Sequence, residues 1–159
     1  MLGIRTADPA RLTDVVDLVV GAVIEPDPAL LAASAAFAGA CGFGSAVALS
    51  QSLPGEPLGI RLPITVPRGL LMGWGAGVAA PWPMPLAAVV AAATAGRVGN
   101  KSVPGAVCVG LGIACILGTL VEPVTRRPRS WTPGVCAAIG INLATSAVLA
   151  AAGVRYARR

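Results

Sequence analysis

The chain of 159 residues contains no histidine. Histidine supplies common ligands of haem iron and zinc, and it is the side chain most suited to proton transfer near neutral pH. Its absence therefore excludes the His-dependent enzyme classes. The four cysteines do not replace it, since they lie in apolar stretches with no Cys-x-x-Cys pair: Cys41, Cys108, Cys115 and Cys136. We expect no metal and no cofactor, and we interpret the thiols as small buried packing residues, with a Cys115–Cys136 contact between neighbouring helices as the alternative.

Charged and aromatic residues are scarce as well. Charged residues make up 12% of the chain and aromatic residues 4%, whereas 55% is hydrophobic. A soluble domain carries about 25% charged residues. The deficit predicts an all-α, polytopic integral membrane protein whose 159 residues form a single membrane domain. The net charge of +5 comes largely from arginines beside apolar segments, so we expect contact with a lipid bilayer and not with nucleic acid.

Helix starts recur along the chain, each with an Asp, Ser or Thr just ahead of a proline and a long apolar stretch. They are Asp27-Pro28, Thr65-Val66-Pro67, Ser102-Val103-Pro104 and Thr132-Pro133. Such a side chain caps the first helical turn, and a proline there loses no hydrogen bond. The sequence therefore predicts about four transmembrane helices, near residues 28–50, 68–96, 103–121 and 133–153.

The second of these stretches is interrupted by Pro81, Pro83 and Pro85. Alternating prolines break an ordinary helix, so we expect a break at 81–85. Two full spans do not fit, because each needs about 20 residues. A single kinked span is the preferred interpretation, and a re-entrant hairpin or two short tilted spans are the alternatives.

Residues 12–25 have apolar side chains at helical spacing, with Asp14, Asp17 and Glu25 on the other face. This pattern predicts an amphipathic helix that lies at the membrane interface or docks on protein. Arg and Lys number seven on one side of a four-span arrangement and five on the other. The excess favours both termini on the cytoplasmic side.

Small residues recur at four-residue spacing on two predicted spans. They are Ala38, Gly42 and Ala46 on the first, and Gly110, Ala114 and Gly118 on the third. Such faces let a second helix backbone approach closely. We expect these faces to pack against helices of the same chain, of a protein partner or of a homo-oligomer.

Glu122 is the candidate catalytic residue. Its carboxylate closes the third span, where it opposes the helix dipole, so we expect the following arginines to compensate it. These are Arg126, Arg127 and Arg129. A substrate-handling or proton-handling role is the alternative, because acidic groups within membrane segments are often functional.

Asn142, Thr145 and Ser146 share one face of the fourth predicted span. We expect them to bond neighbouring helices, and Asn142, Thr145 and Arg126 are the candidate substrate-binding residues if a site exists.

The scarcity of catalytic groups favours a solute transporter or a membrane subunit of a larger complex over an enzyme. The alternative is an intramembrane enzyme for a lipid-soluble substrate, with Glu122 as acid or base and Asn142 or Arg126 orienting the substrate. A purely structural membrane protein is the third possibility. The richness in Ala, Gly, Arg and Pro is typical of a GC-rich bacterial genome, so we predict a bacterial plasma membrane as the location.

Overall fold

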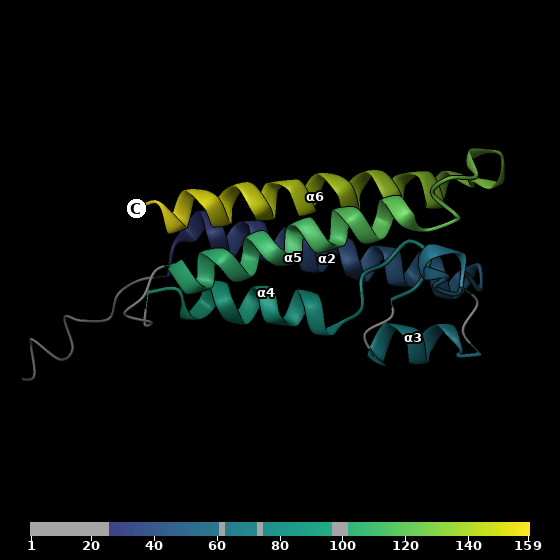
Figure 1. Ribbon diagram of the computed structural model, residues 1–159, viewed down its shortest axis with the longest axis horizontal. Helices are drawn as coiled ribbons and strands as arrows, with labels where there is room; N and C mark the ends of the chain where they lie inside the picture. Colours follow the sequence, from purple (N-terminus) through teal and green to yellow (C-terminus); the bar gives the residue numbers. More distant parts are fainter. Residues whose placement is uncertain (1–25, 61–62, 73–74, 97–101) are drawn as a thin grey trace, which may run out of the picture.

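The computed structural model describes residues 26–60, 63–72, 75–96 and 102–159, and this part of the chain contains helices and no β-strand. Three helices are long and apolar enough to cross a membrane: α2 (Pro28–Ser50), α5 (Ser102–Val121) and α6 (Pro133–Ala157). The shorter elements are η1 (Pro57–Gly59), α3 (Val66–Met72), α4 (Pro83–Thr94) and η2 (Pro128–Ser130) (Figure 1). The predicted all-α membrane fold is confirmed. The amphipathic helix predicted at 12–25 lies outside the described residues.

α2 and α6 begin directly after the predicted caps, whereas α5 begins at Ser102 itself. The Asp27 carboxylate accepts hydrogen bonds from the N–H groups of Ala29 at 3.0 Å and Leu30 at 2.9 Å. The Thr132 hydroxyl accepts one from Val135 N–H at 3.2 Å. Each cap is followed by a proline in the first turn, where no intrahelical bond is lost. A helix of 23 residues such as α2 is about 35 Å long, enough to cross a bilayer.

The four apolar helices form a ring. α2 packs against α4 and α6, and α5 packs against the same two helices from the other side (Figure 1). The α5–α6 contact is the most extensive, because the backbones approach closely: a Cβ on Gly112 would lie 2.5 Å from the carbonyl oxygen of Ser146. Aliphatic, aromatic and thiol side chains fill the centre of the ring, among them Leu30, Phe37, Cys41, Cys108 and Leu149.

In the part of the chain that the structure describes, the predicted small-residue faces do not pack against another helix of the same chain; their contact with a partner or a second copy stays a prediction. A Cβ on Gly42, Gly110 or Gly118 would meet nothing within 4 Å, and Ala46 and Ala114 are exposed. A membrane-facing surface and a helix-facing surface are both apolar, so a repeat of small residues does not indicate which one it forms.

The close approaches occur on other faces of the same helices. On α2, a Cβ on Gly44 would lie 2.5 Å from the carbonyl oxygen of Val78. On α5, a Cβ on Gly105 would lie 2.8 Å from that of Gly153 on α6. Glycine is therefore required where a helix meets the non-helical residues between α3 and α4, or its neighbouring helix.

The second predicted span is divided into α3 and α4, with residues 75–82 between them in non-helical conformation. A tight turn closes this irregular segment, since the N–H and carbonyl groups of Ala76 and Ala79 bond each other at 3.0 and 2.7 Å. The predicted break at 81–85 is displaced, because Pro83 and Pro85 start α4 and do not interrupt it. Its first turn tolerates proline. α3 and α4 together run from one end of the ring to the other (Figure 1).

The start of α2 and the end of α6 meet at one end of the ring, which we call the closed end. Arg155 lies 3.7 Å from the Asp27 carboxylate, and Arg159 forms a shorter ion pair with the same group. α6 extends past the predicted residue 153, so that Tyr156 is buried and its hydroxyl donates to the carbonyl oxygen of Ala95. At the opposite end lie residues 51–60 and 122–132, which we call the cavity end.

Candidate functional site

Glu122 follows the last residue of α5 at the cavity end and is 9% exposed. One carboxylate oxygen, Oε2, accepts a hydrogen bond of 3.1 Å from the backbone N–H of Glu56. That donor lies in the connection after α2, which places two loops distant in sequence against each other. Glu122 is thus held by a neutral backbone group from another part of the chain.

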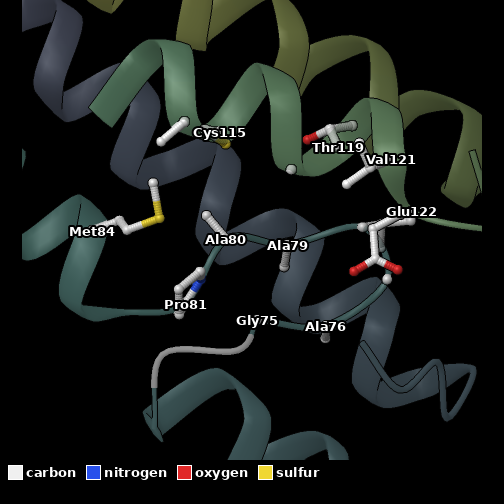
Figure 2. A pocket seen from close by; sticks show the side chains of 14 residues that line it. Gly75, Ala76, Ala79, Ala80, Pro81, Met84, Cys115, Thr119, Val121 and Glu122 are labelled. Atoms are coloured by element: carbon white, nitrogen blue, oxygen red, sulfur yellow. The ribbon is translucent and has the colours of Figure 1, made fainter. Parts of the chain in front are cut away.

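An inner cavity of about 110 Å³ opens on one side of Glu122. Its walls come from α5, from the irregular segment and from the start of α4, as Figure 2 shows. The Glu122 carboxylate is directed toward the irregular segment, and Thr119 and Cys115 lie one and two turns further along α5. The remaining lining side chains are apolar, including Ala80, Met84 and Val121. The inner cavity is therefore an apolar space with one carboxylate at its margin.

An outer cavity of about 190 Å³ lies on the other side of the same residue. The residues around it are Leu53, Pro54, Glu56, Glu122, Pro123, Val124 and Arg127. Glu122 is the residue that lines both cavities. Its side chain therefore lies between a space bordered by α5, the irregular segment and the start of α4 and a space at the cavity end.

The surroundings of Glu122 favour its neutral form. Burial raises the pKa of the carboxyl above its ordinary value, the hydrogen bond from Glu56 N–H lowers the pKa, and the negative charge of the Glu56 carboxylate raises it. The net result is a raised pKa. A carboxyl group of this kind exchanges a proton at a higher pH than an exposed glutamate does.

A buried polar cluster joins α5 to α6 behind the inner cavity. Asn142 is 1% exposed and donates from Nδ2 to the Thr119 hydroxyl at 3.0 Å. The Cys115 thiol donates to Asn142 Oδ1 at 3.5 Å. Thr119 therefore belongs to both features: it bonds Asn142 of α6, and it is one of the residues that line the inner cavity.

The other candidate residues do not line the inner cavity. Arg126 donates from Nε to the carbonyl oxygen of Leu120 at 3.3 Å, so it compensates the end of α5 directly. The Thr145 hydroxyl donates to its own helix, at 2.9 Å to the carbonyl oxygen of Ile141. Asn142 bonds the neighbouring helix, as expected. Among the candidates, Glu122 is the one at the cavity.

The cysteines follow the packing interpretation with one exception. Cys41, Cys108 and Cys115 are buried, whereas Cys136 is exposed on the first turn of α6, so its predicted burial was wrong. All four thiols are free. Within the described ranges, no three acidic or thiol side chains come close enough to form a metal site.

Sequence reasoning missed the irregular segment as a wall of the site, together with the contact of Glu56 to Glu122. The available signal was the glycine-rich stretch 73–77 ahead of the prolines, because glycine and proline together mark irregular backbone. The contact between two loops at the cavity end has no local sequence signal. Comparisons with protein-family models, with characterised proteins and with solved structures found no match to this chain.

Proposed function

We propose that this protein is a small-solute transporter of a bacterial cell membrane, and that the inner cavity is its solute site. The observation that carries the proposal is the position of Glu122, a carboxylate with 9% exposure that lines cavities on both sides. Ionisable groups are costly inside a membrane protein and are commonly found on substrate or proton pathways.

The irregular segment supports this proposal. Non-helical backbone at membrane depth is tolerated where it is buried in protein or lines a cavity, and transporters commonly bind their substrates at interrupted helices. Here residues 75–81 form one wall of the inner cavity, between α3 and α4. An interrupted helix beside a buried carboxylate is a combination that suits a solute site in a transporter.

The difference between the two ends of the ring is a second support. The closed end is fastened by ion pairs from Asp27 to Arg155 and Arg159, whereas the inner and outer cavities border Glu122 toward the other end. A third hollow, of about 520 Å³, lies at the closed end between α2 and α6, and alanines make up most of its lining. A transporter that exposes its site alternately to each side of the membrane has one end sealed in each state. A closed end held by ion pairs, with the Glu122 cavities toward the opposite end, fits a state in which the site is sealed from one side of the membrane.

The intramembrane enzyme hypothesis has less support. It needs Glu122 together with Asn142 or Arg126 at one substrate position, and neither partner lines the cavity. A membrane subunit of a larger complex is the second candidate function. The observation that favours it is the open space around Gly39, Gly42 and Gly140, where a partner helix could approach without a clash.

Solute uptake into vesicles tests the transport proposal. Purified protein is reconstituted into liposomes, and light scattering follows the entry of cationic, neutral and anionic solutes with up to about five heavy atoms, the size that the cavity admits. We expect at least one solute to enter faster than it enters empty liposomes. Equal rates for every solute would overturn the proposal.

Two glycine variants of α5 provide the matched comparison. Gly118 lines the inner cavity and Gly110 does not, while a Cβ on either meets nothing within 4 Å. Gly118→Leu therefore fills the cavity without a backbone clash, and Gly110→Leu adds the same side chain elsewhere on the same helix. We expect Gly118→Leu to abolish the uptake and Gly110→Leu to preserve it. Native mass spectrometry of the same samples tests the subunit alternative through bound protein partners.

A further inference from the structure

We propose that the inner cavity selects a small primary ammonium ion, an inference that rests on the transport proposal and names its substrate class. The cavity joins three features that this class of solute needs. It has a nearly buried carboxylate, a hydroxyl group on the same helix and an apolar remainder.

The charge of the cavity selects a cation. Glu122 is the one charged side chain among the described residues that line the space. Within the described ranges no ion pair to Glu122 is seen, although Arg127 borders the outer cavity on its other side. Such a buried carboxylate is unfavourable, and a cation that enters the inner cavity offsets this cost. An anion would be repelled. An amino acid would carry its own carboxylate into a space with no Arg or Lys side chain on its described walls.

The oxygen atoms around the cavity are too few for a metal ion. Calcium takes six to eight oxygen ligands, magnesium an octahedral set, and potassium a shell of carbonyl oxygens. The irregular segment does not offer such a shell, because the carbonyl oxygens of Ala76 and Ala79 bond within their own turn. That of Val78 lies against Gly44. A primary ammonium group needs fewer oxygen atoms, because it has three N–H donors and each donor needs a single acceptor.

Thr119 provides an acceptor besides the carboxylate. Its hydroxyl oxygen accepts one hydrogen bond from Asn142, and the residue is part of the lining of the inner cavity. A hydroxyl oxygen has two acceptor positions, so one remains for a ligand. Asn142 in turn is held by Cys115, which fixes the position of the Thr119 hydroxyl. The acceptor is therefore built into the contact between α5 and α6.

The rest of the cavity suits a short alkyl chain. Ala80, Met84 and Val121 contribute carbon and sulfur surface. A volume of about 110 Å³ is smaller than the 150 Å³ cavity that accommodates benzene, so it admits a solute of about three to five heavy atoms. The described lining has no aromatic ring, the group that typically recognises quaternary ammonium ions. Primary alkylammonium ions fit these conditions better than quaternary ones.

Calorimetric titration of the purified protein with propylammonium tests this inference. Propanol and propionate are neutral and anionic probes of similar shape, and tetramethylammonium lacks N–H donors. We expect propylammonium to bind at least about tenfold more tightly than each of these, the difference that one charged hydrogen bond makes. Equal binding of propylammonium and propanol would contradict the proposal.

Three variants locate the site. Glu122→Gln keeps an oxygen for Glu56 N–H and loses the charge, so we expect at least about tenfold weaker propylammonium binding. Thr119→Val removes the second acceptor at nearly constant volume, and a loss of about fivefold is expected. Gly110→Leu is the control with unchanged affinity, and circular dichroism verifies that every variant retains its helix content. Unchanged affinity in both Glu122→Gln and Thr119→Val would overturn the proposal.

The titration also separates the substrate class from the transport function. If propylammonium does not bind while uptake of another solute is still abolished by Gly118→Leu, the substrate class is wrong and the transporter proposal stands. If propylammonium does not bind and no solute enters the liposomes, both proposals are wrong. Binding that depends on Glu122, together with uptake that Gly118→Leu abolishes, supports both.

Discussion

Asp27 and Glu122 are two carboxylates of equal exposure, 9% each, at opposite ends of the ring. Asp27 accepts two backbone hydrogen bonds and faces Arg155 and Arg159. Glu122 accepts a backbone hydrogen bond and lines two cavities. The same chemical group is thus structural at one end, where charges of opposite sign surround it, and available to a ligand at the other. Burial alone does not distinguish the two roles; the partners do.

The largest effect is expected at the closed end. Asp27→Ala removes a helix cap, which costs about 1 kcal/mol, and two ion pairs with exposed arginines, each contributing less than about 1 kcal/mol. We expect the free energy of unfolding to fall by about 2 kcal/mol in denaturant titrations of the detergent-solubilised protein. Asp27→Asn keeps the cap and loses the charge, so about half of this loss is expected. A loss as large as that of Asp27→Ala would assign the whole effect to the ion pairs.

Tyr156→Phe is expected to have an intermediate effect. It removes the hydrogen bond from the buried hydroxyl to Ala95, which costs about 1 kcal/mol of unfolding free energy. A double variant with Asp27→Asn tests whether the closed end acts as one unit. If the two losses of unfolding free energy add within about 0.5 kcal/mol, the Tyr156 hydrogen bond and the Asp27 ion pairs act independently. A larger departure from additivity would show that they are coupled.

Glu122→Gln is expected to change the pH dependence of stability. Because the pKa of Glu122 is raised in the folded protein, the folded state retains the proton over the interval in which the unfolded chain releases it. Stability therefore falls as the pH rises from the ordinary carboxyl value through the raised one. Glu122→Gln removes this decline, as thermal unfolding across that interval would reveal. An identical slope in wild type and variant would contradict the assignment.

The smallest effect is expected for Ser146→Ala. The Ser146 hydroxyl is fully buried, and among the described residues it has no geometrically good hydrogen bond, only the Cys115 thiol, a weak partner, beside it. Its removal leaves stability unchanged or raises it by about 1 kcal/mol, because an unsatisfied polar group is lost. Ser45→Ala is the matched control, since the buried Ser45 hydroxyl donates to Cys41 at 2.7 Å. We expect about 1 kcal/mol of destabilisation there, measured by the same titration. A loss of similar size in both variants would reveal a partner for Ser146.

Local signals predicted the starts of the long helices. The cap at Asp27 and the apolar stretch behind it predicted 28–50, which is the extent of α2, and Thr132 predicted the start of α6. A cap side chain bonds backbone groups within one helical turn, so a few consecutive residues are enough to predict where the helix starts. The proline pattern predicted an interruption but not its position, since Pro83 and Pro85 are compatible with a first helical turn.

Contacts between distant segments were not predictable in the same way. The choice of Gly44 and Gly112 as packing residues, and not Gly42 and Gly110, depends on how each helix is rotated toward its neighbour. In a membrane protein the hydrophobic pattern does not encode that rotation, because lipid and protein neighbours are both apolar. Glu122 was identified as a candidate from its type and position. Its backbone partner lies 66 residues earlier and left no sequence signal.

The pairing of Asp27 with Arg159 has a consequence for biosynthesis. These two residues are 132 positions apart in the chain. As the ribosome elongates the polypeptide, α2 reaches the membrane long before the arginines of α6 exist, and Asp27 can then serve only as the cap of its own helix. The ion pair therefore forms only after the chain has been synthesised through α6. A chain stalled before that step holds α2 with its cap but without this ion pair.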